Sequence, residues 1–174
     1  KQATITKDKL SAIDGKLARL TPLTYSGTKR PMINPRQNTD RFKPTKAKQL
    51  RFTIFKTNNL EPCIDELEVW AGDRNVALAS YGTKPTASGT LAGYDIHKLE
   101  HLNDGRPGNG RSWISNEGGK GWVQLEFLQT EKIQRIRWAR DREGNFRDRV
   151  ATDYVVEVAT VPGEWRAVAS SADR

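Results

Sequence analysis

The chain contains very few of the residues on which disulfides, zinc sites and thiol or histidine catalysis depend. Its 174 residues include one cysteine, Cys63, and two histidines, His97 and His101. A single cysteine forms no intramolecular disulfide and no cysteine-based zinc site, so we expect Cys63 to be a small buried apolar residue. No apolar run reaches the roughly 18 residues that a membrane-spanning helix needs. We therefore expect no membrane span.

The sequence patterns of common enzymes are missing as well. There is no Gly-rich phosphate loop, no HExxH and no GxSxG. Asp141 and Glu143 are close in sequence, and some hydrolases use a pair of carboxylates. Their neighbours Arg140 and Arg142 would keep both carboxylates ionised, which opposes a general-acid role. We therefore expect a protein that is not an enzyme.

Positive charge is concentrated at the start of the chain. The net charge is +8, but residues 1–48 hold 12 Lys and Arg against 3 Asp and Glu, and residues 49–174 hold 17 against 18. The main body is therefore almost neutral, and a general nucleic-acid-binding surface is not expected there. The basic segment also has few aromatic residues for stacking on bases. The near-neutral charge of the main body does not exclude a local basic patch on it.

Residues 1–48 are predicted to form a basic helix followed by a linker or wrapping segment. Apolar residues recur at helical spacing between Thr6, a candidate N-cap, and Pro22: they are Leu10, Ile13, Leu17 and Leu20. Residues 22–48 are rich in proline, lysine and arginine, a composition typical of linkers. Because the sequence begins at Lys1 and shows no signal peptide, we expect it to be part of a longer protein.

Residues 49–174 are predicted to form a β-sandwich. Short stretches that alternate apolar and polar residues are separated by Gly, Pro and Asn, as in all-β sandwiches. They cover residues 50–55, 64–70, 122–127, 133–138, 154–158 and 165–168. Longer loops, 80–112 and 139–152, fall where such folds carry recognition residues.

Aromatic residues divide into two predicted groups. Trp113, Trp122, Trp138 and Trp165 fall in or beside strand patterns, and we expect them in the core. Tyr81, Tyr94 and Phe146 fall in loops. Exposed rings on loops are the better candidates for stacking on a sugar, and His97 and Lys98 are near enough to Tyr94 in sequence to join it.

From residue 75 to residue 170 the sequence resembles the factor 5/8 type C family, which is also called discoidin or galactose-binding-like. The stretch 75–80, followed by 86–89, is similar to the family's first strand and turn. Residues 101–105 and 112–115 resemble its "DG…W.S" signature, and 121–127 its "WVQLEF" strand. The resemblance implies a jelly-roll β-sandwich that binds a ligand without catalysis.

Two strands of the family pattern stand in an unusual place. In the family the "VRFTI" and "ELEVWG" strands close the domain, whereas here residues 50–55 and 63–70 precede the rest. A circular permutation explains this order, since domains with adjacent termini tolerate permutation. The arrangement is similar to bacterial modules in large planctomycete-type multidomain proteins. It implies a secreted, periplasmic or cell-surface location and contact with other domains of the parent protein.

The resemblance also implies a structural calcium ion near the "DG" loop. Its ligands would come from that loop (His101, Asp104, Arg106 and Ser112) and from the displaced strand (Asp65 and Glu66). Calcium takes six to eight oxygen ligands, including carboxylates and backbone carbonyls. In the alternative without a metal, Asp104 caps the turn before Gly105 and Glu66 pairs with an arginine.

A ligand site is expected at the loop end of the sandwich. Its candidate residues are Arg140, Asp141, Arg142, Arg147, Arg149, Tyr94 and His97. Fucose-binding lectins of this fold use an Arg–x–Asp–x4–Arg pattern in the equivalent loop, but the spacing here differs and no histidine stands near Ser115, so fucose specificity is not implied. Arginine forks suit sugar hydroxyls, carboxylates and sulfates. Alternatively, these arginines form surface ion pairs that only hold the loop.

The sequence therefore predicts a non-catalytic carbohydrate-binding module whose ligands include acidic or sulfated glycans. The alternative is a module that recognises a protein or a lipid headgroup. Relatives that bind phospholipid insert apolar residues from their loops, and the Arg- and Gly-rich loops of this chain have few of them.

Overall fold

A computed structural model describes residues 30–174 of the protein. The predicted helix between Thr6 and Pro22 lies outside the described residues. Within them, the elements in chain order are β1 (Asn38–Thr57), β2 (Cys63–Ile64), β3 (Glu66–Ala71), β4 (Arg74–Asn75), the 3₁₀ helix η1 (Ala79–Tyr81), β5 (Lys84–Ala87), the 3₁₀ helix η2 (Leu99–Asn103), β6 (Trp113–Ile114), β7 (Gly121–Ala139), β8 (Ala151–Ala159) and β9 (Arg166–Ser170).

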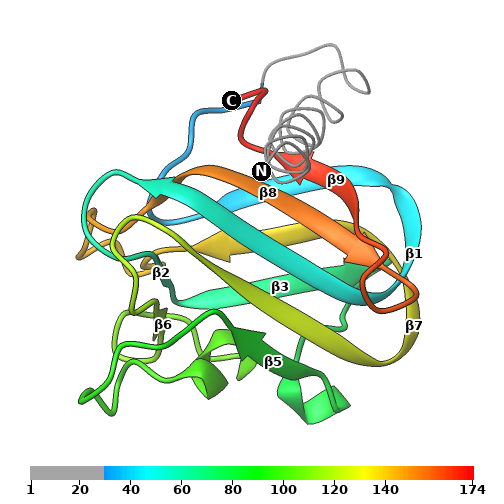
Figure 1. Ribbon diagram of the computed structural model, residues 1–174, viewed down its shortest axis with the longest axis horizontal. Coiled ribbons are helices and arrows are strands. Elements are labelled where there is room, and N and C mark those ends of the chain that lie inside the picture. Colours follow the sequence, from blue (N-terminus) through cyan, green and yellow to red (C-terminus); the bar gives the residue numbers. More distant parts are fainter. Residues whose placement is uncertain (1–29) are drawn as a thin grey trace, which may run out of the picture.

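Two long strands, β1 with 20 residues and β7 with 19, organise the fold. They pair antiparallel, and the pairing is interrupted between Arg41 and Thr45 and between Ala47 and Gln49. Irregularities of this kind bend a strand and increase its twist. Figure 1 shows both strands doubling back at the same end of the molecule. Each long strand therefore contributes to two layers.

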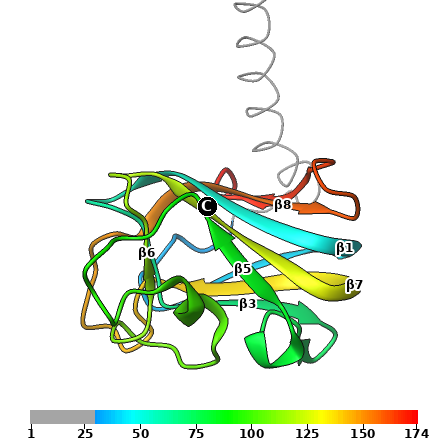
Figure 2. The same ribbon diagram turned by 60° about the horizontal axis from the view of Figure 1, so that its bottom comes forward.

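One layer contains the C-terminal half of β1, which lies between the N-terminal half of β7 and β8, with β5 and β9 outside them. The second layer contains the N-terminal half of β1, the C-terminal half of β7, β3 and β4. Figure 2 shows the layers facing each other. The predicted all-β, sandwich-like architecture is confirmed, and every strand pairing in the named elements is antiparallel.

The core lies between the layers and follows the two-residue period of the strands. The buried residues Leu50, Phe52 and Ile54 of β1 alternate with half-buried neighbours, and β7 repeats the pattern. The rings of Phe52, Trp138 and Tyr154 form a cluster with centroids 4.8–5.3 Å apart. Aromatic contacts at these distances stabilise a core beyond the area they bury.

Two tryptophans expected in the core are on the outside of the first layer. Trp122 and Trp165 are only half-buried, and the guanidinium of Arg51 lies 5.1 Å and 4.1 Å from their ring centroids. The prediction was wrong because Val123 faces inward, so its neighbour Trp122 must face outward. Trp113 and Trp138 are fully buried, as expected.

Strand boundaries also differ from the prediction. The stretches 122–127 and 133–138, expected as separate strands, both belong to β7, and the stretch 64–70 is divided at Asp65 between β2 and β3. β1 begins at Asn38, so one continuous strand crosses the boundary expected between residues 48 and 49. The strand expected over residues 75–80 is limited to β4, after which the chain enters a turn and η1. Proline and lysine made the first half of β1 look like a linker, although Asp40, Phe42 and Ala47 are buried there.

A buried carboxylate joins the two ends of the described chain. Asp40 is fully buried, and its oxygens accept hydrogen bonds from the Tyr154 hydroxyl at 2.7 Å and from Trp138 Nε1 at 3.1 Å. Arg30 and Arg174 both form ion pairs with the same carboxylate. The Arg30 backbone N–H also donates to the carbonyl of Asp173, so the segments around residues 30 and 174 lie side by side.

No helix within residues 30–174 has the length and apolar character required to cross a membrane.

Candidate functional site

Loops from distant parts of the sequence meet at the end of the molecule opposite the bends of β1 and β7 (Figure 1). The segment between β1 and β2 connects them. Its carbonyls at Asn59, Leu60 and Pro62 accept hydrogen bonds from the backbone N–H groups of Arg149, Gly119 and Ser115 respectively. The short β2–β6 pair lies beside these contacts. Backbone bonds therefore fix three loops against one another, which gives side chains at this end defined positions.

Arg140, a predicted ligand residue, is 2% exposed and makes contacts within the protein. Its guanidinium pairs with Asp148 at 2.9 Å and donates to Asn109 Oδ1 at 2.6 Å. It also donates to Cys63 Sγ at 3.3 Å and lies 5.0 Å from the ring centroid of Phe146. Arg140 therefore joins the loop 106–112 to the loop 140–149.

Asp141 is fully buried and holds the loop that follows it. Its carboxylate accepts backbone hydrogen bonds from Glu143, Asn145 and Phe146 at 2.7–3.2 Å. A carboxylate that satisfies successive backbone donors fixes a turn. The role of Asp141 is therefore to shape the loop from which Phe146 is presented, 43% exposed.

The other three arginines of this loop differ in their contacts. Arg149, whose φ of 57° is left-handed, pairs with Glu61 and lies 3.4 Å from Asp148. Arg142 pairs with Glu68 of β3. Arg147 is exposed and lines, with Arg142, a cavity on the β1 side of the loop. The expected ion-pair network therefore exists, but it includes Arg140, Arg142 and Arg149 and not Arg147.

Tyr94 and His97 line a groove of about 590 Å³ formed by residues 90–100. The Tyr94 ring is 56% exposed, and its centroid lies 5.8 Å from that of the imidazole. His97 Nδ1 is 2.8 Å from Ser112 Oγ, which fixes the ring, and Nε2 has no hydrogen-bond partner among residues 30–174. Lys98, at the same groove, pairs with Asp95 at 2.9 Å. The groove therefore combines the exposed Tyr94 ring with His97 Nε2, which no other described residue contacts through a hydrogen bond.

His97 also lies near the Arg-rich loop, with whose residues it was predicted to share one ligand site. Partial burial lowers its pKa, and the positive charges of Arg140 and Arg149 lower it further. The imidazole is therefore neutral at pH 7, with Nε2 available as donor or acceptor according to tautomer.

Two buried carboxylates stand where the calcium ion was predicted. Glu66 is 1% exposed, and its two oxygens share one backbone donor, the N–H of Gly105, at 3.2 Å. Burial raises its pKa to about 8, and the charges of Asp104 and Glu68 contribute. Burial likewise raises the pKa of Asp65. Asp65 Oδ2 accepts from Gly108 and Arg142, but Oδ1 is buried without a partner among the described residues.

The side chains of Asp104, Ser112 and His101 already have protein partners, although His101 and Arg106 were predicted to contribute backbone carbonyls. Asp104 accepts from the backbone N–H of Arg106 at 2.8 Å and pairs with Arg111, which agrees with the expected turn cap. Ser112 Oγ contacts His97 and the carbonyl of Asn109. His101 Nδ1 is 3.1 Å from the carbonyl of Ile96. Among residues 30–174, Glu66 forms no ion pair with an arginine, unlike the alternative without a metal.

Within the described part of the chain, no three His, Cys, Asp or Glu side chains are grouped closely enough to hold a metal ion. A calcium site rich in backbone carbonyls does not require such a group. Burial disfavours the charged form of Glu66, and a cation bound by one or two carboxylates and loop carbonyls would favour that form instead.

Cys63, predicted to be a small buried residue, is 1% exposed. Burial raises the pKa of its thiol to about 11, so it is protonated at neutral pH and is not a nucleophile.

Comparisons with known proteins found no counterpart for this chain: no family model, no curated protein and no solved structure matches it.

Proposed function

We propose that this chain is a non-catalytic carbohydrate-binding module with a jelly-roll sandwich of the factor 5/8 type C kind. The two layers, with loops gathered at one end, support this assignment. The hydrogen bond between Arg30 and Asp173 supports a circular permutation, because adjacent ends are what permutation requires. By the same resemblance the module belongs to a larger extracytoplasmic protein and contacts its other domains.

One observation carries the carbohydrate proposal: the half-exposed Tyr94 ring beside the fixed His97 imidazole in an open groove. Sugar sites combine an apolar face, on which the pyranose C–H groups stack, with a few placed hydrogen-bonding atoms. Tyr94 supplies the face. His97 Nε2 and Lys98 supply polar groups, and Arg149 lies near enough to influence the histidine electrostatically. Arg140 and Asp141 support this end of the fold and do not contact the ligand.

Binding to a glycan array, followed by affinity electrophoresis in gels containing the polysaccharides that bind, tests the proposal. We expect retention of the intact chain, and loss of that retention in Tyr94→Ala and His97→Ala. Tyr81→Ala is the matched control, because Tyr81 is 50% exposed but lines a different hollow. Equal retention of Tyr94→Ala, Tyr81→Ala and the intact chain, or binding to no glycan, would contradict the proposal.

We further propose that calcium orders the loop beside this site. Glu66 and Asp104 would hold the ion through carboxylate oxygens. The other ligands would be the backbone carbonyls of His101 and Arg106, the Ser112 hydroxyl and an oxygen atom of Asp65. Bound calcium would balance the negative charge of the Glu66 carboxylate, which would then remain unprotonated. This role needs Ser112 Oγ and Asp104 to exchange their present partners for the ion.

Recognition of a lipid headgroup is the second candidate function, and Ile96 is the observation that favours it. This side chain is 45% exposed between Tyr94 and Lys98, so one loop presents an aromatic, an aliphatic and a basic residue. Such a set suits a membrane interface. Co-sedimentation with phosphatidylserine vesicles, reduced in Ile96→Ser, would support this function over the carbohydrate proposal.

A further inference from the structure

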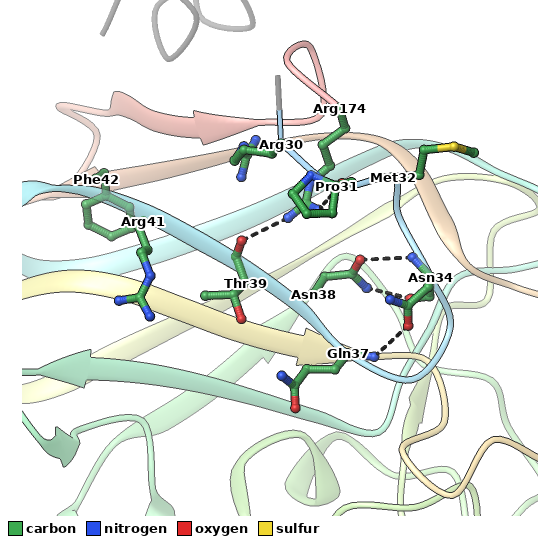
Figure 3. Close-up of a pocket in the computed structure, with 10 residues that line it drawn as sticks. All are labelled: Arg30, Pro31, Met32, Asn34, Gln37, Asn38, Thr39, Arg41, Phe42 and Arg174. Carbon is green, nitrogen blue, oxygen red and sulfur yellow. Dashed lines mark hydrogen bonds between the residues drawn. The ribbon is translucent and has the colours of Figure 1, made fainter. Parts of the chain in front are cut away.

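A second group of arginines lies away from the Tyr94 groove, on the outer surface of the layer formed by β3, β7 and the N-terminal half of β1. Thr39 and Arg41 face outward between the buried residues Asn38, Asp40 and Phe42. Figure 3 shows Arg41, Thr39 and Gln37 projecting to the same side of β1.

The strand register places like charges directly opposite each other on this surface. Arg41 of β1 pairs with Arg135 of β7, and Arg135 pairs with Trp70 of β3. In the next row, Arg137 stands between Thr39 and Glu68. Directly opposed like charges destabilise a sheet. Additional negative charge at this surface would therefore stabilise the Arg41–Arg135 pair.

The protein supplies little of that negative charge. Glu68 is the acidic residue of the two rows, and it is already shared by Arg137 and Arg142. Arg135 stacks on Trp70, with its guanidinium carbon 4.5 Å from the ring centroid. Within residues 30–174, four arginines here form no ion pair: Arg36, Arg41, Arg135 and Arg147. Several guanidinium nitrogens, including Arg142 Nη2, are buried without an acceptor.

Two adjoining cavities extend from Arg41 along the segment before β1 to the loop after β7. The first, of about 680 Å³ and shown in Figure 3, is lined by Arg30, Arg41 and Arg174. The second, of about 740 Å³, is lined by Arg36, Arg142 and Arg147. They share Asn34 and Gln37 and therefore adjoin, so we call the two cavities together the arginine channel; no Asp or Glu among the described residues lines either part. Arg30 and Arg174 are neutralised by Asp40 and Asp173, whereas Arg36, Arg41 and Arg147 are free.

We propose that this arginine channel is a second binding site, which takes a linear polysaccharide bearing sulfate or carboxylate groups. Arginine forks bind such groups through paired hydrogen bonds. Arginines spaced along the channel match anionic groups repeated along a polymer, and Asn34 and Gln37 between them suit sugar hydroxyls. The channel does not depend on the Tyr94 groove, so it stands whether or not that groove binds a sugar.

Nucleic acid is disfavoured as the ligand because the surface has no platform for bases. Single-stranded nucleic acids bind where basic residues alternate with exposed rings. Trp70, the aromatic residue in the two rows, is covered by Arg135 and contacted by Arg137, 5.7 Å from its ring centroid.

Heparin, a sulfated linear polysaccharide, is the probe, with dextran and oligothymidylate as comparisons. Isothermal titration of the full chain should show heparin binding that weakens with salt, because each neutralised anion releases counterions. The test variant is Arg36→Gln/Arg41→Gln/Arg147→Gln, which removes three exposed, unpaired arginines. The matched control, Lys56→Gln/Lys84→Gln/Arg166→Gln, removes the same charge from exposed positions on β1, β5 and β9.

We expect the test variant to lose at least about tenfold in heparin affinity, since a single hydrogen bond to a charged group is worth that factor. The control variant and Tyr94→Ala should bind heparin like the intact chain, and dextran should not bind. Equal loss in the test and control variants would show that only net charge matters and would overturn the proposal. Unchanged binding in the test variant would also overturn it, because the affinity would then belong to other basic residues, and so would oligothymidylate binding tighter than heparin.

Discussion

Replacing Asp40 by asparagine should be among the most destabilising conservative changes in this protein. Asp40 is fully buried and forms ion pairs with Arg30 and Arg174. It also accepts from the Tyr154 hydroxyl and Trp138 Nε1. Asparagine keeps the size, but it removes the charge and turns one acceptor oxygen into a donor that faces other donors.

The expected cost follows from leaving buried groups without partners. Breaking a buried ion pair on one side costs about 3–5 kcal/mol in the free energy of unfolding. For a domain of this size, that loss lowers the melting temperature by about 6–20 °C. Arg30 retains Asp173 and the carbonyl of Ser170, and Arg174 retains the carbonyls of Pro31 and Thr39, so we expect the lower half of the range.

Urea unfolding followed by tryptophan fluorescence measures this loss. Asp95→Asn is the matched control, since the Asp95 side chain is 97% exposed and its pair with Lys98 should contribute little. Tyr154→Phe, which removes one hydrogen bond to the same carboxylate, should cost about 1–2 kcal/mol. An Asp40→Asn protein as stable as Asp95→Asn would refute the claim that this network joins the two ends of the described chain.

Three further predictions concern the metal, pH and the outer surface of the sheet. The melting temperature of the intact chain should be higher with calcium than with a chelator, and Glu66→Gln should reduce that difference. Equal melting temperatures of the intact chain with calcium and with chelator would count against the site. Burial raises the pKa of Glu157 above its usual 4.5, so the native state holds this proton more tightly than the unfolded chain, and stability falls as pH rises above about 4.5. Urea titrations at several pH values should show this decline reduced in Glu157→Gln, and identical profiles would disprove the assignment. Arg51→Gln should cost about 1 kcal/mol, because it removes the cation stacked on Trp122 and Trp165; no change in urea unfolding would show that the stacking contributes nothing.

The strands of this fold were largely predictable because burial on one side leaves a two-residue pattern. The expected strands at residues 50–55, 122–127 and 154–158 all fall within β1, β7 and β8. The outward position of Trp122 was implied by the same alternation. Composition misled the prediction at residues 38–48, where Pro44 and three lysines lie on a strand whose inward residues include Asp40 and Phe42.

The candidate sites depended on contacts that no local pattern records. Arg140 is buried because Asn109 and Cys63 approach it from other loops. The arginine channel arises because residues 34–37, which precede β1, lie against the loop that carries Arg142 and Arg147. The sequence located basic residues in the first 48 positions but could not show that some of them lie against arginines of the main body.

The measurement that tests the central claim most directly is the comparison of Tyr94→Ala with Tyr81→Ala on a polysaccharide that the intact chain binds. Both substitutions remove a half-exposed ring from a loop or short helix, so differences in folding should be small. The account predicts that Tyr94→Ala loses retention in affinity electrophoresis while Tyr81→Ala migrates like the intact chain. Equal retention of both variants would contradict a carbohydrate site in the groove of residues 90–100.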